Sequence, residues 1–101
     1  MKIKGKRKLL QELARECENP REFIYGIMAL QNQKVEDVAR GAGMTIKHFH
    51  VFIGRISKGK NGISPKLCIK LSRGLDIDPY ILNRVIGDFN IKTHLQEQQT
   101  E

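Results

Sequence analysis

Each of the three prolines in this 101-residue chain directly follows a residue that caps helices well. The pairs are Asn19-Pro20, Ser64-Pro65 and Asp78-Pro79. Asn, Ser and Asp side chains accept hydrogen bonds from the first N–H groups of a helix, and proline suits the first helical position because no N–H is needed there. A chain whose prolines all mark helix starts is constrained to build its fold from helices.

Apolar residues recur at three- and four-residue spacing along most of the chain, as on one face of a helix. No alternating stretch of any length indicates a strand. The spacing predicts helices over about residues 6–17, 20–31, 34–41, 45–58, 65–74 and 79–86. We therefore expect one all-α domain of five to six short helices, with Gly74 and Gly87 ending the last two.

The second and sixth predicted helices raise packing questions. In the second, Phe23, Ile24, Ile27, Met28 and Leu30 should face a core, while Gly26 costs about 1 kcal/mol relative to alanine unless packing there is tight. The sixth is more apolar than one small core needs. Its outer side and the residues after it either form a dimer contact or pack into the core. The residues concerned are Tyr80, Ile81, Val85, Ile86, Phe89 and Ile91.

The net charge of +7 is distributed unevenly. Residues 2–8 carry five cations and no acid, and the 38 residues between Asp37 and Asp76 carry eight cations and no acid. Residues 76–101 reverse the sign, with five acids and two cations. Such polarity fits a face that binds a polyanion, and nucleic acid is the usual polyanion for a small basic protein. The alternative is a set of solvated helix faces.

Several other classes of protein fit the sequence poorly. No apolar run is long enough to span a membrane, and no apolar segment follows the basic N-terminus as a signal peptide would require. The two cysteines, Cys17 and Cys68, are typical of a reduced cytoplasmic protein rather than of a disulfide framework. His48 and His50 would point about 200° apart on a helix and could not share a metal ion. Without a carboxylate in the central region to orient a base, we expect no enzyme, cofactor or metal.

The segment from Thr45 to Lys58 is the strongest functional candidate. On a helical wheel Phe49, Phe52, Ile53 and Ile56 lie on one side and must face the core. The opposite side carries lysine, valine and glycine, with histidines and an arginine along its edges. Glycine permits close approach, valine can meet a thymine methyl, and the cations can donate to guanine or phosphate. The alternative is that Gly54 marks a kink and Val51 touches a neighbouring helix.

The motif pattern around this segment resembles the lambda-repressor-like helix-turn-helix family, also called the xenobiotic-response-element family. The similar features are Val38-Ala39 in the scaffold helix, the turn Gly43-Met44-Thr45, a glycine-containing loop from Gly59 to Pro65, and ISPKLCIKLSRGLDIDP over residues 63–79. The resemblance covers about residues 21–86. One feature departs from the family: Gly59 follows Gly43 by sixteen positions, about one helical turn more than usual.

The resemblance implies a DNA-binding regulator, most simply a repressor, whose helix 45–58 enters the major groove of double-stranded DNA. We expect the chain to be divided into a basic arm and first helix (1–19), the helix-turn-helix domain (20–87) and a polar tail (88–101). Base-edge candidates are Lys47, His48, His50, Val51 and Arg55, after the cap Thr45. Phosphate candidates are Gln33, Lys58, Lys60 and Asn61. Family members often bind as homodimers on half-sites about 34 Å apart.

Two other functions remain open at this point. An antitoxin-like protein could use the same fold to cap a toxin or bind an anti-repressor, with binding to its own operator as a by-product, because "GKNGISP" is similar to loops of helix-turn-helix antitoxins. RNA binding is the third possibility, but the basic region lacks exposed aromatic residues for stacking. The basic residues 2–8 form either an arm on DNA or a solvated tail.

Overall fold

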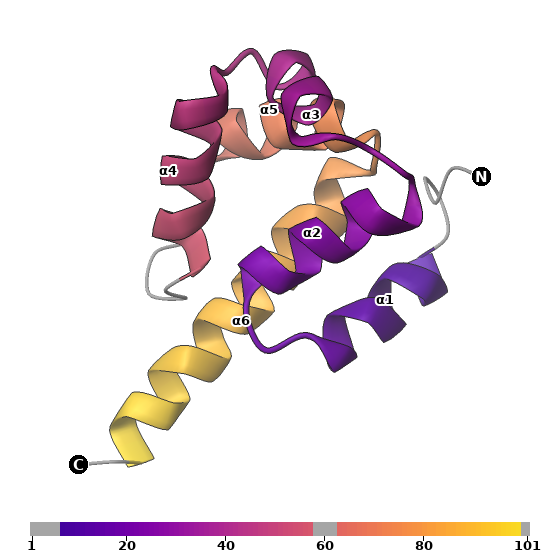
Figure 1. Cartoon of the computed structure of the whole chain (residues 1–101). Coiled ribbons are helices and arrows are strands. Elements are labelled where there is room, and N and C mark those ends of the chain that lie inside the picture. Colours follow the sequence, from indigo (N-terminus) through magenta and orange to yellow (C-terminus); the bar gives the residue numbers. More distant parts are fainter. Residues whose placement is uncertain (1–6, 58–62, 100–101) are drawn as a thin grey trace.

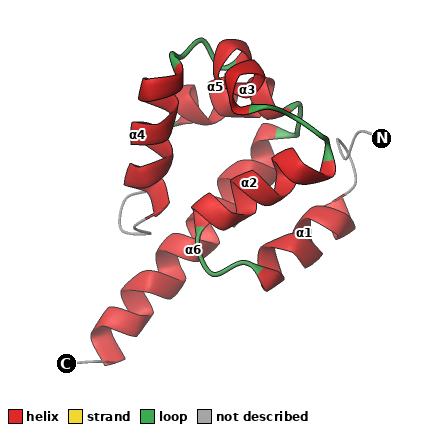
Figure 2. Cartoon of the chain, viewed as in Figure 1, coloured by secondary structure: helices red, strands yellow, loops and turns green. Residues whose placement is uncertain are grey.

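A computed structural model describes residues 7–57 and 63–99 of the chain, and these residues form helices joined by loops, with no strand (Figures 1 and 2). The helices are α1 (Arg7–Glu16), α2 (Pro20–Leu30), α3 (Val35–Gly41), α4 (Ile46–Ser57), α5 (Pro65–Leu75) and α6 (Pro79–Gln99). The all-α prediction with five to six helices is confirmed. None of the described helices is both long enough and apolar enough to cross a membrane.

The three predicted capping residues all begin helices. Asn19 accepts a hydrogen bond from the N–H of Glu22 at 3.0 Å, and Ser64 accepts one from the N–H of Leu67 at 3.2 Å. Asp78 accepts from the N–H of Tyr80 at 2.9 Å. The starts of α2, α5 and α6 are thus fixed by local chemistry, as the sequence predicted.

Two glycines mark places where helices approach closely. A Cβ on Gly26 in α2 would lie 3.0 Å from a methyl of Leu13 in α1, so the tight packing suggested by the sequence is confirmed. A Cβ on Gly74 in α5 would lie 2.3 Å from the carbonyl oxygen of Val38 in α3. The opposing residue on α3 is Gly41, whose own Cβ would lie 2.9 Å from the Cα of Gly74. The α3–α5 crossing therefore depends on a pair of glycines.

The prediction that Gly74 ends the fifth helix was wrong. Helix α5 continues to Leu75, and Asp76 adopts the left-handed conformation with a φ of 58°. Its N–H donates to the carbonyls of Arg73 and Ser72. Aspartate tolerates this conformation better than most residues, so the turn does not need the glycine.

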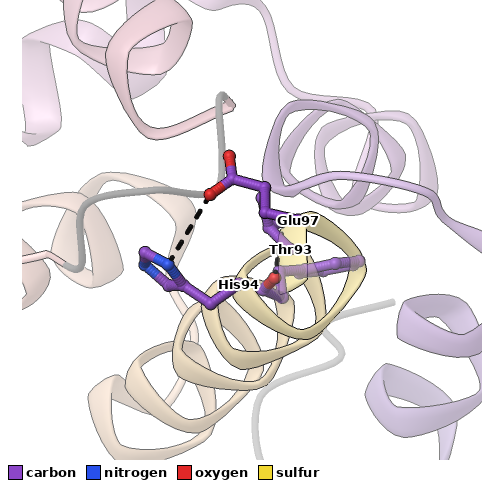
Figure 3. A network of polar contacts seen from close by, with 4 residues as sticks. Thr93, His94 and Glu97 are labelled. Carbon is purple, nitrogen blue, oxygen red and sulfur yellow. Dashed lines mark hydrogen bonds and ion pairs between the residues drawn. The ribbon is translucent and has the colours of Figure 1, made fainter. Parts of the chain in front are cut away.

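The prediction that Gly87 ends the sixth helix was also wrong, because α6 runs for 21 residues through most of the predicted polar tail. Val85, Ile86 and Phe89 are buried on both sides of Gly87 and hold this part of the helix against the core. Beyond them Thr93 donates to the carbonyl of Phe89 at 3.0 Å, and His94 Nδ1 lies 4.0 Å from Glu97 Oε2 (Figure 3). This C-terminal part extends away from the other helices (Figure 1).

The core lies between α2, α4, α5 and α6, with α1 and α3 completing it. Of the α2 residues predicted to be inward, Leu30 was assigned wrongly: it is 49% exposed, because it is the last residue of the helix and no described neighbour covers that end. The sequence left open whether the apolar residues of α6 pack into the core or form a dimer contact, and most of them pack into the core. Ile81, Val85, Ile86 and Phe89 are buried, which removes them from any dimer contact.

Candidate nucleic-acid interface

The segment that the sequence predicts to be a helix-turn-helix consists of α3, the turn of residues 42–45 and α4. In Figure 1 α3 is seen nearly end-on while α4 runs along the edge of the molecule, so the two axes cross steeply. Gly43 has a φ of +72° and lets the chain turn, and the N–H of Met44 closes the end of α3 by donating to the carbonyl of Ala39 at 2.8 Å. Thr45 then accepts from the N–H of His48 at 3.1 Å and caps α4, as predicted.

The inner face of α4 holds the helix firmly in place. Phe49, Phe52, Ile53 and Ile56 are each at most 5% exposed. This face packs against α2 and α3, so the arrangement predicted by the helical wheel is confirmed. Burial of four large apolar side chains, each worth about 1.5–3 kcal/mol, fixes which residues the helix turns outward.

Nothing in residues 7–57 and 63–99 covers the outer face of α4. Lys47, His48, Val51 and Arg55 are all exposed, and Val51 retains 52% of its accessible surface. A Cβ on Gly54 would have no described atom within 4 Å beyond its own stretch of helix backbone. Neither the predicted kink nor a contact between Val51 and a neighbouring helix is needed to explain these residues. This face combines cations with a central apolar area, formed by the small residues Val51 and Gly54, which project little from the helix.

His50 lies on the edge of α4 nearest α2, where its Nδ1 is 3.3 Å from the hydroxyl of Tyr25. The guanidinium of Arg21 stacks over the Tyr25 ring, 5.7 Å from its centroid. If the tyrosine O–H donates to Nδ1, the Nε2 of His50 carries the remaining proton and can donate outward. Sequence reasoning missed Arg21 and Tyr25. Their spacing of four residues on one helix face was the available signal, but the contact with α4 is not local.

Gln33 has a role that the sequence did not predict. Its Nε2 donates to the carbonyl of Leu75 at 3.1 Å, and Gln31 donates to the same carbonyl. The two glutamines are also joined to each other at 3.1 Å. The Gln33 amide therefore ties the start of α3 to the end of α5, and a phosphate contact from Gln33 would compete with this bond.

Some predicted contacts lie outside the described residues. These are Lys58, Lys60 and Asn61, together with the basic residues 2–6. Within the described part of the acid-free stretch, Arg40 is less available than its sequence position suggests, because its guanidinium lies 3.8 Å from the Asp37 carboxylate on the same helix. On α4 and its flank, Lys47, Arg55 and Arg21 are exposed and therefore accessible to a polyanion.

Other kinds of site are weakly represented. Across residues 7–57 and 63–99 no three His, Cys, Asp or Glu side chains gather as metal ligands would. Both thiols are free: Cys68 is buried and donates to the carbonyl of Pro79 at 3.3 Å, while Cys17 is half-buried. Burial raises the pKa of both thiols, and Glu22 and Glu16 raise that of Cys17 further. A protonated thiol is a poor nucleophile, so neither cysteine resembles a catalytic one.

Comparison with known proteins yields no match: no family model, no curated protein and no solved structure is significantly similar to this chain.

Proposed function

We propose that this protein is a sequence-specific regulator that binds double-stranded DNA with α4 in the major groove. The observation that carries the proposal is the outer face of α4, which is cationic, free of acidic residues and uncovered, while its inner face is locked into the core. A helix held in this way presents its side chains in fixed positions, as base reading requires.

The dimensions of α4 fit a groove. Its 12 residues give a length of about 18 Å, and a helix with side chains is about 10–12 Å wide, close to the roughly 12 Å width of the major groove. Lys47, His48 and Arg55 would donate to base acceptors. Val51 would meet a thymine methyl, and the missing side chain at Gly54 would let the backbone approach the bases.

The flank formed by Arg21, Tyr25 and His50 supports a phosphate contact beside the groove. The Tyr25 hydroxyl orients the His50 ring, and Arg21 stacks on Tyr25, so two donors from different helices lie on one edge of α4. Lys58, Lys60 and Asn61 are the proposed phosphate contacts at the other end of the helix. With roughly six to eight phosphates neutralised, the logarithm of the affinity should fall with log[salt] with a slope of about −5 to −7.

We also propose that the protein acts as a homodimer formed through the outward face of α6. Tyr80, Ile91 and Leu95 are 84%, 60% and 54% exposed and fall within about 80° of one another and of Gly87 on a helical wheel. A Cβ on Gly87 would meet no described atom within 4 Å beyond its own helix backbone, so no packing in the described chain accounts for a mid-helix glycine. Close approach of a second helix would account for it.

The test of DNA binding starts from a random-site selection and continues with fluorescence anisotropy on the selected duplex. Lys47→Ala and Arg55→Ala should each weaken binding by about 1–3 kcal/mol and relax sequence preference. Lys92→Ala and Arg15→Ala are the matched controls, because they remove the same charges from exposed positions on α6 and α1. Selection of no preferred sequence, or equal losses in controls and test variants, would contradict the proposal.

The dimer is tested separately by sedimentation equilibrium. Ile91→Glu should shift the protein to monomer, whereas Ile69→Glu, which changes an isoleucine 51% exposed on α5, should not. Capture of a stoichiometric foreign protein from native extract, with no homodimer, would favour the antitoxin-like alternative.

A reduced chain with free thiols is consistent with a cytoplasmic location, which we include in the proposal.

A further inference from the structure

A cavity of about 460 Å³ lies between α1 and α6, away from α3 and α4. Pockets that bind small molecules in proteins usually measure about 300–1,000 Å³. The cavity is lined from α1 by Gln11, Ala14, Arg15 and the following Cys17, and from α6 by the side chains of three successive turns. None of these residues belongs to the proposed DNA-binding face.

The floor of the cavity is apolar. Val85 and Phe89 are 5% and 7% exposed and come from adjacent turns of α6. The Phe89 ring packs against the ring of Phe23 in α2, with centroids 6.5 Å apart. Ala14 on α1 contributes only a methyl group on the opposite side. The floor is therefore formed by the core itself and exists without a ligand.

The rim of the cavity is cationic. Arg84, Asp88 and Lys92 follow one another at four-residue spacing along α6, and Arg15 lies on the α1 side. The rim thus carries three cations and one carboxylate. Across residues 7–57 and 63–99 no ion pair within 4.0 Å neutralises Arg15, Arg84 or Lys92. An anionic group would therefore meet a rim with an excess of positive charge above an apolar surface.

We propose that this cavity binds a small amphipathic anion, an apolar chain or ring that carries one carboxylate. The carboxylate lies between Arg15 and the cations of α6, and the apolar part rests on Val85 and Phe89. A purely inorganic anion would gain the charges but leave the apolar floor unused, and an amphipathic cation would be repelled by the rim. The inference does not depend on DNA binding.

Cys17 provides an independent reporter at the wall of the cavity. Its thiol is half-buried, and burial together with Glu22 and Glu16 raises its pKa, so it is protonated and uncharged at neutral pH. A ligand can therefore pack against it as against an apolar group. Occupation of the cavity should shield this thiol from a modifying reagent, whereas Cys68 is already buried in the core.

The proposal is tested with the full chain and the fluorescent anion 8-anilinonaphthalene-1-sulfonate as the probe. The probe should bind at one saturable site, and octanoate should displace it. Octylamine and inorganic phosphate at equal concentration should not. Octanoate should also slow modification of Cys17, located by mass spectrometry, at least severalfold.

The double variant Arg84→Gln/Lys92→Gln should weaken octanoate binding at least tenfold. The matched control Lys66→Gln/Arg73→Gln removes the same charges from exposed positions on α5 and should leave the affinity within twofold. All four residues are exposed, so both proteins should fold, which circular dichroism verifies. The proposal is overturned if octylamine or phosphate displaces the probe as well as octanoate does, if the control loses as much affinity, or if Cys17 stays unprotected.

Discussion

Replacing Gly74 by alanine should destabilise the protein, although alanine is the better helix former. The new Cβ would lie 2.3 Å from the carbonyl oxygen of Val38 and 3.1 Å from the backbone nitrogen of Ala42. Both are backbone atoms, one in α3 and one in the C-cap residue that follows it, so no side-chain rotation can relieve the overlap. An ordinary carbon–oxygen contact is about 3.3–3.6 Å, and α3 and α5 must therefore separate by about 1 Å.

The size of the effect follows from two opposing terms. Overpacking of a well-packed region costs about 1–3 kcal/mol, and rigid backbone on the far side points to the upper end. The gain in helix propensity from Gly to Ala returns about 1 kcal/mol. We expect a net loss of about 2 kcal/mol, which for a domain of this size corresponds to a decrease in Tm of roughly 8–16 °C.

Gly54→Ala is the matched comparison, because Gly54 is also a helical glycine but has open space where a Cβ would be. This variant should gain about 1 kcal/mol from propensity alone. The free energy of unfolding is measured for both variants by urea denaturation. The conclusion that the α3–α5 crossing requires glycine at position 74 is refuted if Gly74→Ala is as stable as the original protein. It is also refuted if both substitutions change the free energy of unfolding in the same direction.

Three further predictions concern the cap, the dimer and the thiols. Thr45→Ala should cost about 1 kcal/mol of unfolding free energy because the N–H of His48 loses its acceptor, while Thr45→Ser should cost little; equal losses on thermal denaturation would contradict the cap. Gly87→Ala should weaken the proposed homodimer in sedimentation equilibrium while making α6 intrinsically more helical by about 1 kcal/mol, and unchanged dimerisation would place the contact elsewhere. Burial in the folded state raises the pKa of the Cys68 thiol above its ordinary value of 9.0, so the folded protein binds this proton more tightly than the unfolded chain does. The corresponding stability is complete below pH 9 and is lost as pH rises through the raised pKa; Cys68→Ala should remove that part of the pH dependence, and urea titrations that show the same slope for both proteins would refute it.

Sequence alone determined the features of this protein that depend on neighbouring residues. The capping residues and prolines placed the starts of α2, α5 and α6, because an N-cap and the N–H it binds lie within three residues of each other. The side of α4 that is buried also followed from sequence, because four large apolar residues at helical spacing admit one orientation.

Tertiary structure decided the features that depend on distant residues. The sequence predicted a helix end at Gly74, but this glycine lies where α3 crosses α5. The sequence also predicted a helix end at Gly87, but core packing on both sides keeps α6 helical through this residue. The contact between Tyr25 and His50 joins residues that are 25 positions apart in the sequence. The bond from Gln33 to the Leu75 carbonyl joins residues that are 42 positions apart. Local propensities amount to about 1 kcal/mol per residue, and burial of a few large side chains exceeds them, so where the two disagree the packing prevails.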